Sequence, residues 1–152
     1  MYSSVRGSAS GIRLGAVVLA LVTALIHFYL FLVKGFVGSG SMLPVYQLLF
    51  FCNFLVYTGL AAALYSPALA RYRRLVRVLL VAVAVASFAS YLYAAAFDLL
   101  GTVDKLVEIL LVVLIAIDAG ILGRDARDAA LQLAVGALAG IVLFFILTLV
   151  MI

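Results

Sequence analysis

Charged side chains are scarce in this sequence. Only 11% of its 152 residues are Asp, Glu, Lys or Arg, whereas 69% are hydrophobic. A soluble domain carries about 25% charged and about 45–50% apolar residues, so this chain has too few polar groups to cover a surface exposed to water. The scarcity excludes a soluble globular fold and predicts that the lipid bilayer surrounds most of the protein.

Cysteine and histidine are each present once, as Cys52 and His27. One cysteine excludes an intrachain disulfide and a CxxC motif, and one histidine excludes a bis-imidazole haem or a His-rich zinc or copper site. The sequence has no phosphate-binding loop, HExxH motif or EF-hand, and no platform for nucleic acid. A triad of Ser90, His27 and Asp98 is excluded because helical rise places Asp98 about 10 Å shallower than His27. We therefore expect no metal and no cofactor, and we find no catalytic set.

Five long apolar runs divide the chain, and turn-forming residues or arginines separate them. Each run has about the 20 residues that a helix needs to cross a bilayer core of about 30 Å. The predicted spans are residues 14–33, 45–65, 75–97, 103–122 and 129–152. The sequence therefore predicts one all-α domain over residues 1–152, a polytopic transmembrane helical bundle of about five spans.

The positive charges fall almost entirely on one side of these spans. That side receives Arg6, Arg13, Arg71, Arg73, Arg74, Arg77, Arg124 and Arg127, and the other receives Lys34 and Lys105. Because positive flanks stay in the cytoplasm, we expect a multi-pass plasma membrane protein with a cytoplasmic amino terminus and an external carboxyl terminus. The alternative, a signal peptide within the first 33 residues, is disfavoured because the apolar stretch is too long and has no convincing cleavage site.

Polar residues in four spans come to a common depth. Counting helical rise from each span centre places them in the outer half of the membrane, and they are His27, Asn53, Ser90, Tyr91 and Glu108. An ionisable group in hydrocarbon costs at least about 2.5–3.5 kcal/mol, so these side chains should face protein or water. One interpretation is a small polar cavity with His27 and Glu108 as its titratable pair. The other is a set of structural hydrogen bonds between helices.

Helical phase groups the same residues with others. At about 100° per residue the fourth span aligns Asp104, Glu108, Leu111, Ile115 and Asp118. Comparable stripes in the other spans are Ala16, Ala20, Thr23 and His27; Tyr46, Phe50, Asn53 and Tyr57; and Ser87, Tyr91, Ala94 and Asp98.

Two ion clusters are expected along the fourth span. At its outer end Lys105 is adjacent to Asp104 and within a turn of Glu108, and Asp98 can join them. At its inner end Arg77 can reach Asp118, and Gln132 can donate a hydrogen bond there. Both clusters are most simply interpreted as structural.

The last span contains a GxxxG motif, formed by Gly136 and Gly140. Small residues let two helix backbones approach closely, so this face should pack against another helix. The motif leaves open whether that helix belongs to the same chain or to a second subunit.

Three segments resemble a family of small archaeal multi-span membrane proteins of unknown function. They are IHFYLFLV at residues 26–33, FCNFLVYTGLAAALY at residues 51–65 and DKLVEILLVVL at residues 104–114. The resemblance covers roughly residues 14–122. It implies a membrane location and a helical architecture, and it supplies no mechanism.

Three functions follow from these patterns. The first is a non-catalytic subunit or assembly partner of a larger membrane complex, such as a respiratory one, because almost no mass lies outside the spans. The second is a small dimeric permease or proton-linked conduit that uses His27 and Glu108. The third, an enzyme acting on lipid, rests only on arginines that cytoplasmic retention already explains. The expected partners are lipid and either other membrane subunits or further copies of this chain.

Overall fold

The computed structural model describes residues 3–37, 44–94, 97–123 and 125–151, and all the regular structure in these ranges is helical. The long helices are α1 (Ser3–Tyr29), α2 (Pro44–Tyr65), α3 (Arg73–Ala94), α4 (Leu99–Asp118) and α5 (Ala126–Met151). Two short elements join them: η1 (Leu30–Val37) continues α1 as a π-helix, and η2 (Pro67–Tyr72) is a 3₁₀ helix that leads into α3. The predicted all-α transmembrane bundle is confirmed.

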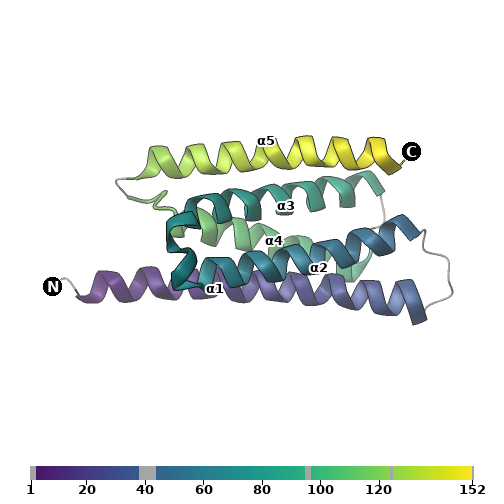
Figure 1. The fold of residues 1–152 in the computed structure, drawn as a ribbon, viewed down its shortest axis with the longest axis horizontal. Helices are drawn as coiled ribbons and strands as arrows, with labels where there is room; N and C mark the ends of the chain where they lie inside the picture. Colours follow the sequence, from purple (N-terminus) through teal and green to yellow (C-terminus); the bar gives the residue numbers. More distant parts are fainter. Residues whose placement is uncertain (1–2, 38–43, 95–96, 124, 152) are drawn as a thin grey trace.

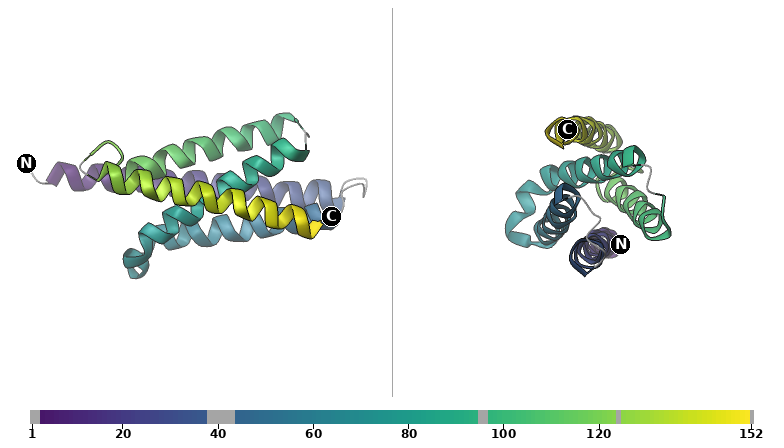
Figure 2. Two further views of the ribbon diagram at one scale, coloured as in Figure 1. Left: turned by 90° about the horizontal axis from the view of Figure 1, so that it is seen from above. Right: turned by 90° about the vertical axis from the view of Figure 1, so that its right-hand side faces the viewer.

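Helices α1 to α4 form a ring, and α5 lies outside it (Figures 1 and 2). Around the ring α1 packs on α2 and α4, and α3 packs on α2 and α4. Helix α5 packs on α3 and contacts α4 only slightly. The chain runs up and down between two ends of the bundle. We call the end that holds Arg13, Arg73, Arg74 and Arg77 the arginine-rich end.

Four segments are long and apolar enough to cross a membrane: Gly11–Val33, Val45–Tyr65, Pro67–Ala94 and Ala126–Leu149. Helix α4 has 20 residues but is more charged, since it holds Asp104, Lys105, Glu108 and Asp118. The first three of these side chains are buried inside the bundle. Apart from Thr102 near its start, the exposed side chains of α4 are apolar, among them Leu106, Ile109, Leu110 and Val113. The outer surface of α4 is therefore as compatible with lipid as the outer surfaces of the other helices.

Helix α4 lies four residues earlier in the chain than the span predicted at residues 103–122. Asp98 begins it, because its side chain accepts a hydrogen bond of 2.7 Å from the Gly101 amide and so caps the first turn. Gly120 ends it with a φ of 94°, a left-handed conformation that glycine adopts without strain. The Gly120 amide bonds to the Ile117 carbonyl and the Ile121 amide to the Ala116 carbonyl, which is the Schellman pattern of a helix end.

Two glycines bring α5 into close contact with α3. A Cβ added to Gly136 would lie 2.7 Å from the Val81 Cβ, and one added to Gly140 would lie 2.5 Å from the Ala82 carbonyl oxygen. Neither distance is possible for real atoms, so only glycine permits this approach of the two backbones. The helix that faces Gly136 and Gly140 is therefore α3 of the same chain.

A buried polar cluster as the candidate functional site

Each helix of the ring sends polar side chains into the interior at one level. They are Thr23 and His27 from α1, Tyr57 from α2, Ser87 from α3, and Asp104, Lys105 and Glu108 from α4. All seven are at most 9% exposed. The spacing of three or four residues places the members from one helix on the same face, which the ring turns inward. We call these seven residues the polar cluster.

Lys105 lies at the centre of the polar cluster. Its ammonium donates to Ser87 Oγ at 2.5 Å and to Glu108 Oε2 at 2.6 Å, and it lies 2.9 Å from Asp104 Oδ2. A buried cation in contact with two carboxylates loses little of its stabilisation on leaving water, because charged acceptors replace the water molecules.

The remaining oxygens of the two carboxylates accept hydrogen bonds from hydroxyl groups. Thr23 Oγ1 donates to Asp104 Oδ1, and the Tyr57 hydroxyl donates to Glu108 Oε1 at 2.8 Å. Every carboxylate oxygen in the polar cluster therefore has a donor or a cation beside it, as the ionised form requires.

The His27 ring is oriented by its own helix. Its Nδ1 lies 2.9 Å from the Thr23 carbonyl oxygen, which can only accept, so Nδ1 carries a proton and donates it. The other nitrogen, Nε2, lies 3.8 Å from Asp104 Oδ2. The rings of Phe50 and Tyr57 lie against the imidazole, with centroids 5.9 Å and 5.8 Å from its own. Nε2 is thus the nitrogen that is free to take up a proton, next to a carboxylate.

The charges of the polar cluster do not balance unless it binds one more cation. Asp104 and Glu108 contribute two negative charges and Lys105 one positive charge, so with a neutral His27 the net charge is −1. An uncompensated charge in a dry interior is strongly unfavourable. One added proton makes the polar cluster neutral, and His27 Nε2 or a carboxylate of the polar cluster can receive it.

Ligand atoms of His27, Asp104 and Glu108 lie within 4.8 Å of one another, which is close enough for a shared metal ion. However, the Lys105 ammonium lies directly against both carboxylates. A metal ion bound by them would have to displace this tethered cation or lie beside it. The donor set therefore fits a proton better than a metal ion.

A line of polar side chains, the polar route, runs from the polar cluster towards the end of the bundle opposite the arginine-rich end, with no hydrogen bond between its first member, Tyr91, and the polar cluster. The Lys105 ammonium lies 6.0 Å from the centroid of the Tyr91 ring. The Tyr91 hydroxyl bonds to Thr102 Oγ1 at 2.9 Å, and the Thr102 hydroxyl donates to the Asp98 carbonyl. Thr102 is exposed and Tyr91 is half-buried, so this route leads from the interior to the surface.

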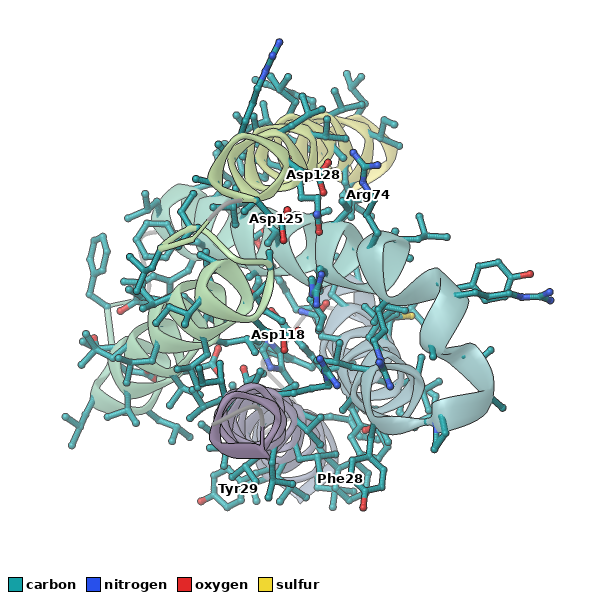
Figure 3. The ribbon with its side chains drawn as sticks, turned by 90° about the vertical axis from the view of Figure 1, so that its left-hand side faces the viewer. Phe28, Tyr29, Arg74, Asp118, Asp125 and Asp128 are labelled. Carbon is teal, nitrogen blue, oxygen red and sulfur yellow. The ribbon has the colours of Figure 1, made fainter. Side chains whose placement is uncertain are left out.

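A second ion cluster occupies the arginine-rich end (Figure 3). The Asp118 carboxylate is fully buried and lies 2.7 Å from an Arg77 guanidinium nitrogen and 3.1 Å from one of Arg13. Gln132 does not contribute to it as expected. It donates instead to Asp128 at 2.7 Å, because both residues lie on α5, one turn apart. We call Arg13, Arg77 and Asp118 the inner ion cluster, and its net charge is +1.

Not every residue expected at the outer site is part of the polar cluster. Asn53 is half-buried and makes none of the contacts described above, and Ser90 donates to the Ala86 carbonyl of its own helix. Tyr91 and Asp98 lie on the route to the surface, since α3 ends at Ala94 and Asp98 is the cap of α4.

The polar cluster also differs from the expected site in its central pairs. His27 lies next to Asp104, whereas Glu108 pairs with Lys105 and Tyr57. Thr23, Tyr57 and Ser87 were not expected among the site residues. Helical phase could have identified two of them from the sequence. It places Thr23 on the same stripe as His27, and Tyr57 one turn after Asn53.

No model of a known protein family matches the chain, and no curated protein and no solved structure gives a match. The resemblance to archaeal membrane proteins therefore stays an expectation from the sequence, and what can be said of function rests on the geometry of the site.

Proposed function

We propose that this integral membrane protein is a small proton-linked conduit or permease, in which His27 and Asp104 hold the exchangeable proton. The observation that carries the proposal is the charge imbalance of the polar cluster, two carboxylates and one ammonium among buried side chains. Ionisable groups are rare inside a membrane and usually mark ion pathways or proton relays. Four helices supply residues to this site, which is more than a single structural ion pair requires.

The proton reaches His27 from the end that bears Asp98. The route along Tyr91 and Thr102 supplies polar atoms from the surface to Lys105. Uptake of a proton at Nε2 makes an imidazolium beside the Asp104 carboxylate. Their separation of 3.8 Å exceeds a hydrogen bond, so the ring must tilt toward Asp104 when it becomes charged.

Towards the arginine-rich end the path is closed. Ten residues of α4 separate Glu108 from the inner ion cluster, about 15 Å at helical rise, and the space is packed with apolar side chains. Leu111 and Ile115 from α4, with Leu64 and Leu80 from the facing helices, are at most 1% exposed. We therefore expect protons to reach the polar cluster from one side only. Release to the other side requires these helices to shift, as alternating access does.

The proposal is tested in liposomes that contain the purified protein and a pH-sensitive dye. With an imposed membrane potential, the protein should acidify the interior, and Asp104→Asn and His27→Gln should each reduce the rate to that of protein-free liposomes. Asp125→Asn removes an exposed carboxylate near the start of α5 and should leave the rate unchanged. Circular dichroism of each variant checks that the helices are retained. Flux at the protein-free level for the unmodified chain, or unchanged flux in both site variants, would contradict the proposal.

A role as a subunit or assembly partner of a larger membrane complex is the second candidate. It is supported by α5, whose outward side chains are apolar and exposed, among them Leu138, Val142, Phe145 and Leu149. Lipid, a second copy or another subunit would each suit this surface. Purification from the native membrane in a mild detergent distinguishes them: a fixed stoichiometry with other membrane proteins supports this candidate, and an isolated monomer or homo-oligomer opposes it.

A further inference from the structure

Arg73 is the first residue of α3 and is partly buried at the arginine-rich end. No hydrogen bond or ion pair joins its guanidinium to another described residue, and its Nε is shielded from solvent without a partner. A shielded donor on a charged group is costly unless an acceptor meets it. The terminal nitrogens of Arg73 are not shielded in this way, so they are the donors that an anionic group from outside the chain can reach.

Arg74 and Arg77, on the same helix, do have acids of their own. Arg74 lies 2.6 Å from Asp128 Oδ1, and Arg77 is held by Asp118. Retention of positive charge in the cytoplasm explains why arginines gather at this end, but it does not explain a half-buried cation without a partner. The lack of an acidic partner thus sets Arg73 apart from Arg74 and Arg77.

The segment just before Arg73 has the composition of a membrane interface. None of the residues of η2 is buried, and Leu69 and Tyr72 are 37% and 43% exposed. The Arg71 guanidinium lies over the Tyr72 ring, 4.6 Å from its centroid. Aromatic and arginine side chains of this kind lie at the level of lipid headgroups. The turn that contains η2 lies at the outer edge of the bundle, where lipid can reach it (Figure 2).

We propose that Arg73 binds the phosphate of an anionic membrane phospholipid, with Arg71 two residues before it in the chain. A guanidinium presents several N–H donors in one plane and matches the oxygens of a phosphate diester. A lipid with net negative charge is favoured over a zwitterionic one, because Arg71 repels a quaternary ammonium in the same headgroup. Basic sites of this kind between or beside membrane helices hold anionic headgroups.

The test is lipid binding to the detergent-purified chain, followed by native mass spectrometry with phosphatidylglycerol and phosphatidylcholine as probes. The unmodified chain should retain phosphatidylglycerol in preference to phosphatidylcholine. Arg73→Gln should weaken that retention at least about tenfold, the equivalent of one charge-assisted hydrogen bond. Arg73→Lys keeps the charge but loses the planar donors, and should fall between the two.

Arg127→Gln is the matched control, because Arg127 is exposed on the first turn of α5, at the same end of the bundle. It removes the same charge, so it should change retention by no more than about twofold, as expected for a screened surface charge. Equal losses in Arg73→Gln and Arg127→Gln, or no preference for phosphatidylglycerol, would overturn the proposal. Displacement of the lipid by inorganic phosphate at equal concentration would assign the site to a soluble phosphate and would overturn it as well.

Discussion

Replacement of Lys105 by methionine is the most informative perturbation of the polar cluster. Methionine has nearly the same length and no charge, so the change removes the ammonium and leaves the packing largely intact. The Asp104 and Glu108 carboxylates, which lie 2.9 Å and 2.6 Å from that ammonium, are then left with no cation between them. Removal of one partner from a buried ion pair costs about 3–5 kcal/mol. We expect Lys105→Met to lose at least this much, since two carboxylates depend on the one cation.

A second substitution separates charge from packing. In the double variant Lys105→Met, Glu108→Gln, one of the two uncompensated charges is gone, and Asp104 can be balanced by a protonated His27. We therefore expect the double variant to be more stable than Lys105→Met alone, by about 1–3 kcal/mol.

The assay is loss of helicity on titration with sodium dodecyl sulfate from a mild detergent, followed by circular dichroism. Arg127→Met is the control, as it replaces an exposed cation and should change stability by no more than about 0.5 kcal/mol. The charge argument is refuted if Lys105→Met costs less than about 1 kcal/mol, or if the double variant is less stable than the single one.

Three further outcomes follow from the fold. Asp118→Asn leaves two partly buried guanidinium groups without their acid and should lower stability by about 3 kcal/mol in the same titration, whereas Asp125→Asn at an exposed position should not. Gly136→Leu should cost about 1–3 kcal/mol by forcing α5 away from α3, seen as faster proteolysis of α5 in the folded protein. Gly120→Ala should lower the thermal midpoint by the equivalent of about 1 kcal/mol, because Gly120 has a φ of 94° that alanine rarely adopts. Gly123→Ala is the control and should have the midpoint of the unmodified chain, because a Cβ at this position would meet only the Gly120 carbonyl oxygen, at 3.6 Å.

The number of helices could be predicted from the sequence because each apolar run has the length that a bilayer dictates. The inward face of α4 could be predicted too, since helical phase alone aligns Asp104, Glu108, Leu111 and Ile115, and all four are buried. Helix ends were less predictable. The apolar run continues past Gly120, so hydrophobicity does not indicate that α4 ends there. The helix end depends on the positive φ of Gly120, which the sequence does not give.

The ion pairs of Lys105 and of Arg77 could be predicted from sequence spacing and depth, but the surroundings of Asn53 and His27 could not. Depth placed Asn53 level with His27, but it does not say which helices are neighbours or which way a half-buried amide turns. Pairing of His27 with Asp104 depends on α1 packing on α4, which is a tertiary contact. Hydroxyl groups such as that of Tyr57 were missed because neutral side chains do not stand out against an apolar span.

The order of the helices bears on how the protein enters the membrane. On its own, α4 is a poor candidate for insertion, because Asp104, Lys105 and Glu108 would each add about 2.5–3.5 kcal/mol in lipid. The ribosome makes α1, α2 and α3 first, and they already carry Thr23, His27, Tyr57 and Ser87. The polar partners of α4 are therefore already synthesised when α4 leaves the ribosome. Stable insertion of α4 into the bilayer thus depends on helices made before it.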